Sequence, residues 1–292
     1  MINPQDELRH PANNDSENWS ESYYFSFTDI PNRISGFFRI GLEENRRQSN
    51  VWCSLFHDGK VIYQRFQFHL PYSDADIGNI QVGGVHFAMT EPMQTFTIGF
   101  SDRQLQVDLM WRGLHDVIDM HKAMGRLSSS LATGHHEQSG AVEGKVSIDG
   151  KVINVNGFGF RDHSWGIRNW EGVRNWKTCA GQFGAEFAFH AAVINELDGA
   201  QFHLGLAYKN HEIVLVDRVD IVIDDLVSPR EGLLTMEFKG GEKTTIDIVY
   251  SPTQICHIPR DFNVVQECHV VLKQNGNIGS GFSEINRSLL YS

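Results

Sequence analysis

The chain has 292 residues, of which 41% are hydrophobic and 21% are charged, and its formal net charge is -11. This composition is typical of a globular protein with enough apolar residues for a core. The negative charge argues against nucleic acid and anionic membrane surfaces as partners, because both attract basic faces.

The chain also lacks the usual signals for export or membrane insertion. No apolar run reaches the roughly 20 residues of a membrane helix, and the polar start of the sequence has no apolar signal segment. The four cysteines, Cys53, Cys179, Cys256 and Cys268, form no C-x-x-C pair. We expect buried free thiols, no integral membrane segment and a cytoplasmic location.

Alternation of apolar and polar residues dominates the chain and predicts β-strands. Tight turns are predicted at Asp58-Gly59, Asp149-Gly150 and Asp198-Gly199, where glycine accepts a positive φ. Apolar residues at helical spacing occur in 114–124, which predicts a short helix or a surface turn. The strand-rich segments, in chain order, are 21–30, 35–44, 51–70, 96–111, 141–160, 186–208, 211–224, 232–250 and 268–285.

The predicted fold class is all-β: two consecutive antiparallel calycin-like or lipocalin-like barrels, or half-barrels, with little helix. Turn signals recur about every ten residues, as in barrels and sandwiches. A single antiparallel barrel needs at most about 150–180 residues, so two units fit the length better. The polar stretch 128–140 is the best boundary. We therefore expect an N-terminal domain over 1–133 and a C-terminal domain over 134–292.

The segment GFGFRDHSWGIRNW, residues 157–170, concentrates acid, base, cation and aromatic groups. In an extended strand, Phe158, Phe160, Asp162 and Ser164 share one face, and Arg161, His163 and Trp165 share the other. An aspartate beside phenylalanines on a buried face would have a raised pKa, which favours its proton-donating form. Alternatively, Asp162 pairs with Arg161 or Arg168, or caps the following turn.

The neighbours of Asp162 also allow two interpretations each. His163 either carries a proton and orients Asp162, or is a satisfied, half-buried strand residue. Trp165, Trp170 and Trp176 either stabilise a developing positive charge through their ring faces or pack in the core.

Other candidate residues lie outside this segment. The adjacent residues His135 and His136 point to opposite faces of a strand, and the sequence has no H-x-H or H-E-x-x-H motif, so we expect no metal and no cofactor. In GSGFSE, residues 279–284, Glu284 alternates with Phe282. Glu284 therefore either points inward, as Asp162 would, or is a solvated edge-strand acid.

The segment from His135 to Trp170, HHEQSGAVEGKVSIDGKVINVNGFGFRDHSWGIRNW, resembles the pattern E-Q-x-G-x-V-x-G…G-x-G-x-R-D-H-S-W-G-x-R of a broad family of lipocalin-like, double-barrel proteins. That family includes proteins related to carotenoid 1,2-hydratase (hydroxyneurosporene synthase) and to kievitone hydratase. Related folds occur in fungal decalin-forming Diels–Alderases. The late motif with Gly279, Gly281 and Glu284 is similar to the family's C-terminal signature.

The resemblance implies a two-lobed calycin fold around an apolar cavity. It also implies that Asp162 occupies the position of an aspartate thought to be essential in the hydratases. Those hydratases carry tyrosine two residues earlier, whereas this chain has Phe160.

Three functions are consistent with these observations. The first is an enzyme acting on C=C bonds of an apolar, isoprenoid-like small molecule by acid-initiated hydration, dehydration or cyclisation. The second is a Diels–Alderase-like pericyclase that folds a polyene. The third is a non-catalytic carrier of a lipophilic ligand. Expected catalytic residues are Asp162, His163 and Glu284. Expected substrate-binding residues are Phe158, Phe160, Arg161, Trp165, Arg168, Trp170, Trp176, His136 and Glu137.

Overall fold

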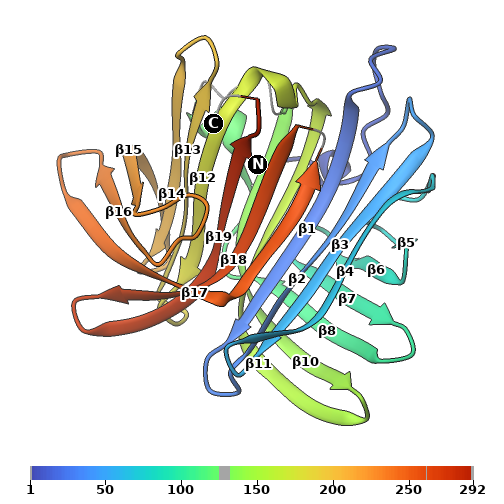
Figure 1. Cartoon of the computed structure of the whole chain (residues 1–292), viewed down its shortest axis with the longest axis horizontal. Coiled ribbons are helices and arrows are strands. Elements are labelled where there is room, and N and C mark those ends of the chain that lie inside the picture. Colours follow the sequence, from blue (N-terminus) through green and yellow to red (C-terminus); the bar gives the residue numbers. More distant parts are fainter. Residues whose placement is uncertain (1, 125–131, 261, 291–292) are drawn as a thin grey trace. The chain divides into compact units, whose positions relative to one another are not determined.

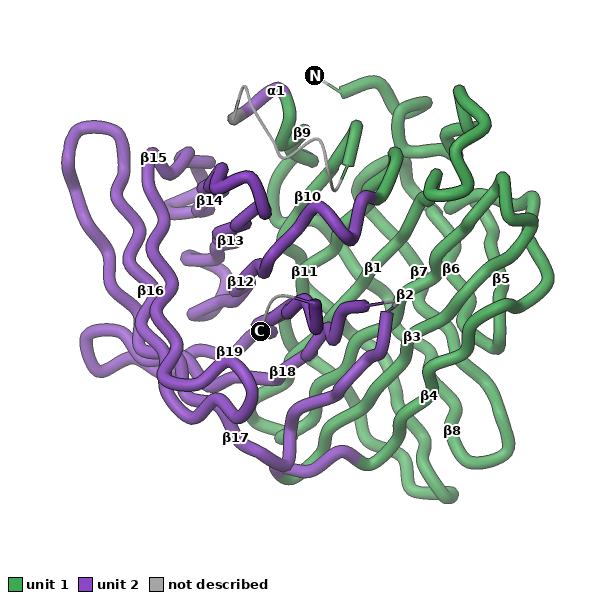
Figure 2. Tube along the Cα trace, turned by 45° about the horizontal axis from the view of Figure 1, so that its top comes forward, with its two compact units in different colours: residues 1–58, 62–121, 132–168 green, residues 59–61, 122–131, 169–292 purple. Residues whose placement is uncertain are grey.

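The computed structural model describes residues 2–124, 132–260 and 262–290. Antiparallel strands dominate both halves of the chain (Figure 1), which confirms the all-β fold class. Figure 2 shows the two compact units into which the chain divides. The first unit comprises 1–58, 62–121 and 132–168, and the second comprises 59–61, 122–131 and 169–292.

The first unit is one antiparallel sheet. Hydrogen bonds connect its strands in the order β4-β3-β2-β1-β11-β10-β8-β7-β6-β5, and β9 pairs with β10. The strand β11, which carries most of the motif, therefore lies between β1 and β10. The elements are η1 Pro4–Glu7, β1 Trp19–Asp29, β2 Ile34–Glu43, β3 Gln48–His57, β4 Lys60–Pro71, β5 Ile80–Val82, β6 Val85–Glu91, β7 Thr95–Ser101, β8 Leu105–Gly113, β9 Ile118–Asp119, β10 Gly134–Ile148 and β11 Lys151–Ile167. The short helix α1, Met120–Met124, is divided between the two units after residue 121.

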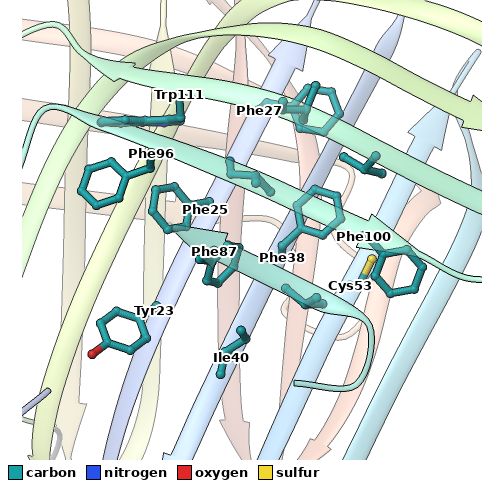
Figure 3. Close-up of a cluster of buried hydrophobic side chains, with 14 of the residues drawn as sticks. Tyr23, Phe25, Phe27, Phe38, Ile40, Cys53, Phe87, Phe96, Phe100 and Trp111 are labelled. Atoms are coloured by element: carbon teal, nitrogen blue, oxygen red, sulfur yellow. The ribbon is translucent and has the colours of Figure 1, made fainter. Parts of the chain in front are cut away.

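Aromatic side chains fill the core of the first unit (Figure 3). Phe25 packs its ring 4.8 Å from that of Phe87, 5.3 Å from that of Phe96 and 5.9 Å from that of Trp111. Each fully buried ring of this kind contributes roughly 1.5–3 kcal/mol. On β1 the residues with odd numbers, from Tyr23 to Phe27, face this core.

The second unit is a closed barrel of eight antiparallel strands in sequential order. Pairing of β12 with β19 closes it. Its core contains Cys179 and Cys268, and all four cysteines of the chain are free and buried, as expected. The elements are η2 Trp170–Gly172, β12 Val173–Gln182, β13 Phe187–Glu196, β14 Gln201–Lys209, β15 Glu212–Ile223, β16 Glu231–Phe238, β17 Lys243–Arg260, β18 Asn263–Gln274 and β19 Asn277–Ser288.

The hairpin turns form where the sequence predicts them. Asp58 and Gly59 have φ angles of 49° and 76°, and Asp149 and Gly150 have φ angles of 48° and 80°. Two consecutive positive φ angles are typical of the two-residue turn that suits the twist of a hairpin. The turn at 149–150 pairs Ile148 with Lys151 and thereby sets the register of the whole β10–β11 hairpin.

The structure divides the chain after Arg168 and not between 133 and 134. β10 and β11 pair with β8 and β1, so the R-D-H-S-W-G motif belongs to the first unit. Of the expected linker 128–140, residues 128–131 lie outside the described residues, and residues 134–140 begin β10. The polar residues of this stretch do not form an exposed linker, because His136 to Ser139 are all buried within the sheet.

The helix predicted over 114–124 is also shorter than expected. α1 covers only its last five residues, Met120–Met124. Ile118 and Asp119 form β9 and pair with Glu137 and His136, so hydrogen bonding to the sheet replaces helical bonding there. Among the described residues, the structure contains no helix with the length and apolar character that crossing a bilayer requires.

We expect His269 on β18 to make the stability of the chain sensitive to acid. Burial lowers its pKa to about 4, below the usual value of about 6.5 for an unfolded chain. Its contribution is therefore complete above pH ~6.5 and is lost as the pH falls toward ~4, because the unfolded state takes up a proton there. We expect wild type to lose about 2–3 kcal/mol more than His269→Asn over this range. Urea unfolding at several pH values measures this difference.

The matched control for this prediction is His211→Asn, because the His211 side chain is 74% exposed. It should leave the pH dependence of wild type unchanged. An identical acid dependence in His269→Asn and wild type would contradict the assignment to His269.

Candidate functional site

The motif strand β11 runs without interruption through Asp162 and His163, so their side chains leave opposite faces of the sheet. Asp162 lies opposite Glu137 on β10 and Tyr24 on β1. The next residue, His163, lies opposite His136 and Tyr23. Paired residues of antiparallel strands point to the same face. The expected contact in which His163 orients Asp162 therefore does not form.

On one face, Asp162 contacts His135, a residue absent from the expected site. Nε2 of His135 is hydrogen-bonded directly to Oδ2 of Asp162. The same nitrogen lies 3.2 Å from Oε1 of Glu137, and Oγ of Ser164 donates to Oδ1 of Asp162 over 3.2 Å. We call His135, Glu137, Asp162 and Ser164 the Asp162 cluster.

The Asp162 cluster is partly exposed to solvent. The side chains of His135 and Asp162 are 19% and 21% exposed, whereas that of Glu137 is fully buried. Burial alone would lower the pKa of His135, but the charges of Asp162 and Glu137 outweigh it and raise that pKa above its usual value. Arg168 donates from Nη2 to Oγ of Ser164 over 2.9 Å, which anchors the cluster at the end of β11.

On the opposite face, which contains the core of the first unit, Arg161 forms a buried ion pair with Glu7. Nη1 of Arg161 donates to Oε1 of Glu7, and Nε donates to Oε1 of Gln138 over 2.7 Å. The guanidinium lies 4.5 Å from the ring centre of Phe96, a favourable cation–π distance. Burial would raise the pKa of Glu7, but Arg161 and the neighbouring imidazoles hold it well below its usual value.

His163 belongs to the same buried region. Its Nε2 lies 2.7 Å from Oε1 of Glu21, which also accepts from the backbone and side chain of His10. Burial would lower the pKa of His163, but the hydrogen bond to Glu21 and the charges of Glu7 and Glu21 raise it to about 9. Trp165 stacks on His10 with ring centres 3.7 Å apart. We call Glu7, Glu21, His136, Arg161 and His163 the inner cluster.

The remaining expected residues fall into two groups. Phe158 and Phe160 are half-buried on the Asp162 face of β11. Trp170, Trp176 and Glu284 form a group of their own within the second unit. There, Nε1 of Trp176 donates to Oε1 of Glu284 over 2.5 Å, and the two indoles lie 5.3 Å apart. Glu284 is on the strand face opposite the second unit's core, because its neighbour Ile285 is in that core.

Metal-ligating side chains converge at three places among the described residues. In each group one donor atom per residue lies within 4.8 Å of the others. The groups are His135, Glu137 and Asp162; Glu7, His136 and His163; and His10, Glu21 and His163. The expectation of no metal rested on spacing along one strand, whereas these groups join different strands and the N-terminal segment.

The position of His135 beside Asp162 could have been predicted from the turn at Asp149-Gly150, because this turn sets the register of the hairpin. Counting back from the pair Ile148 and Lys151 places Glu137 opposite Asp162 and His135 opposite Ser164. His135 then lies diagonally across from Asp162, within reach of a long side chain. No such count reaches Glu7, Glu21 or His10, because their position depends on the pairing of β1 with β11 and on the path of the N-terminal segment.

The chain thus consists of two antiparallel β units, and the motif hairpin of the first carries an acid–imidazole pair. A family model described as a domain of unknown function, DUF7064, matches residues 3–289, and the chain belongs to that family. No curated protein matches the sequence.

Solved structures share the fold at low sequence identity. A protein of Nitrosomonas europaea provisionally assigned as AttH is 12% identical, with a TM-score of 0.63 over 98% of this chain and 96% of that one. CghA in complex with Sch210972 is 14% identical, with a TM-score of 0.67 over 94% and 89%. Kievitone hydratase from Nectria haematococca is 9% identical, with a TM-score of 0.63 over 91% and 87%.

Proposed function

We propose that the chain is an enzyme of the hydratase or cyclase type that acts on C=C bonds of an apolar, isoprenoid-like small molecule. Its proton source is the Asp162–His135 pair. The observation that carries this proposal is the direct hydrogen bond between Oδ2 of Asp162 and Nε2 of His135, beside the buried Glu137. A positioned acid of this kind is what protonation of an unactivated C=C bond requires.

The chemistry of the pair follows from its surroundings. The shared proton moves to one alkene carbon and forms a C–H bond, which leaves a cation on the other carbon. Water captures the cation in a hydration and returns a proton to the pair, whereas a second C=C captures it in a cyclisation. Glu137 keeps a carboxylate close to His135 throughout, which stabilises its protonated form.

Two further observations support the proposal. Phe158 and Phe160 line the same strand face as Asp162 and are only half-buried, so apolar surface adjoins the acid. The fold is shared with a protein named kievitone hydratase. Because Phe160 lacks a hydroxyl, the proton in this chain comes from Asp162 and His135 without a tyrosine at that position. A cytoplasmic location is part of the proposal, and four free, buried cysteines support it.

The test is a product assay in labelled solvent. The purified protein is incubated with kievitone and with acyclic carotenoids, in deuterium oxide and in water carrying heavy oxygen, and products are examined by mass spectrometry. Acid-initiated hydration predicts one solvent deuteron on carbon and one heavy oxygen in the product. Cyclisation through protonation predicts the deuteron alone.

The same assay separates the two alternative functions. A pericyclase converts its substrate into an isomer without solvent label, because no proton is added to carbon. A carrier binds its ligand, seen by native mass spectrometry, and releases it unchanged. An isomer without solvent label, or a bound ligand that is released unchanged, would contradict the proposed acid chemistry.

A further inference from the structure

The inner cluster contains two histidine nitrogens that face one carboxylate without hydrogen-bonding to it. Nδ1 of His136 lies 3.5 Å from Oε2 of Glu7, and Nδ1 of His163 lies 3.6 Å from Oε1. Both nitrogens are buried and have no hydrogen-bond partner among the residues that the structure describes. The side chains of Glu7 and His163 are fully buried, and that of His136 is 3% exposed. Leaving such polar atoms unsatisfied costs about 1–3 kcal/mol each.

We propose that Glu7, His136 and His163 bind one divalent transition-metal ion of the zinc class. Two imidazole nitrogens and a carboxylate are ligands that Zn²⁺ accepts, at bond lengths of about 2.0–2.2 Å. Tetrahedral geometry with such bonds separates neighbouring ligand atoms by about 3.3–3.5 Å. The two separations of 3.5 and 3.6 Å are close to this spacing and are longer than ordinary hydrogen bonds.

The surroundings of His163 match those of a metal ligand. Its other ring nitrogen, Nε2, lies 2.7 Å from Oε1 of Glu21, so it donates a hydrogen bond there when Nδ1 binds the ion. Metal-bound histidines usually donate their second N–H to a carboxylate, which fixes the tautomer and the ring orientation. Glu21 is itself held by the backbone N–H of His10, at 3.0 Å from Oε2.

One ion between the three side chains would bind both histidine nitrogens at once. Protons on the two Nδ1 atoms would instead point at Glu7 over 3.5 Å from His136 and 3.6 Å from His163, which is long for a hydrogen bond. The ion would replace these protons and satisfy both nitrogens. The site is closed to solvent and joins η1 to β10 and β11, so the ion would fasten the N-terminal segment to the motif hairpin.

The Asp162 cluster is the competing metal site, because His135, Glu137 and Asp162 also converge. There, however, His135 and Asp162 are in direct hydrogen-bonding contact, which leaves no space for an ion between them. His135 and His136 are adjacent in sequence and lie on opposite faces of β10. Substituting one or the other therefore distinguishes the two sites.

The test uses the intact protein, freed of metal with a chelator and titrated with Zn²⁺ by calorimetry. We expect one equivalent to bind with a Kd below about 1 μM and to raise the Tm by several degrees. His136→Gln and Glu7→Gln should weaken binding at least about 100-fold. The matched variant His135→Gln should bind as wild type does.

A second measurement needs no variant and covers the case in which a substitution in the buried cluster prevents folding. X-ray absorption of the zinc-loaded wild type should show a shell of nitrogen and oxygen with imidazole scattering and no sulfur. Absence of Zn²⁺ binding by wild type would overturn the proposal. Loss of binding in His135→Gln but not in His136→Gln, or a sulfur-containing shell, would also overturn it.

Discussion

Replacing Asp162 by asparagine is expected to lower the turnover number at least about 100-fold, since a positioned general acid contributes typically 10²–10⁴-fold. Asparagine keeps the shape of the side chain but removes the acid and its bond to the protonated form of His135. The fold should survive, because Asp162 is partly exposed at 21%. The measurement is the rate of the reaction identified in labelled solvent, with circular dichroism to check folding.

Three further variants define the role of the Asp162–His135 pair. Glu143→Gln on β10 is the matched control, because the Glu143 side chain is 61% exposed and forms its ion pair with the exposed Arg112. It should retain the wild-type rate. His135→Gln should lose about as much activity as Asp162→Asn, and the double variant should lose little more, because groups that act as one unit are not additive. Wild-type turnover in Asp162→Asn would contradict the proposed mechanism.

Replacing Arg161 by methionine is expected to lower the free energy of unfolding by about 3–5 kcal/mol, which is the usual cost of breaking a buried ion pair from one side. Arg161 and Glu7 are both fully buried or nearly so, at 1% and 0% exposure. Methionine preserves much of the packing against Phe96 but leaves the Glu7 carboxylate without its cation. Urea unfolding in the presence of a chelator measures the loss without any contribution from bound metal.

The double variant Glu7→Gln/Arg161→Met tests the cause of that loss. Removing the carboxylate together with its cation should recover at least about 1 kcal/mol relative to Arg161→Met alone, because coupled residues are not additive. The exposed pair of Arg112 and Glu143 is the control, and Arg112→Met should change stability by less than about 1 kcal/mol. Strict additivity of the two buried substitutions would show that Glu7 and Arg161 are not coupled.

The fold class follows from the sequence because its signals are local. Alternating residues and the turns at Asp58-Gly59 and Asp149-Gly150 specify antiparallel hairpins, and the structure contains them. The boundary between the units did not follow, because buried polar residues in 136–139 have the composition of a linker. Their polarity serves the two clusters, one on each face of β10.

The candidate site shows the same difference between local and distant signals. The alternation of side chains along a strand correctly places Asp162 and His163 on opposite faces of β11. The family resemblance draws attention to Asp162. His135 becomes visible only when the hairpin register is counted from its turn. Glu7 and Glu21 could not be predicted, since η1 and β1 meet β11 through contacts that span more than 140 residues of sequence.

The most direct test of the central claim, that His135 and Asp162 hold one proton between them, is NMR of the protein labelled with ¹⁵N in its histidines. We predict a strongly downfield imidazole N–H proton that is assigned to His135. It should disappear in both His135→Gln and Asp162→Asn and persist in His163→Gln. Persistence of that signal in Asp162→Asn, or its loss only in His163→Gln, would contradict the pairing on which the proposed function depends.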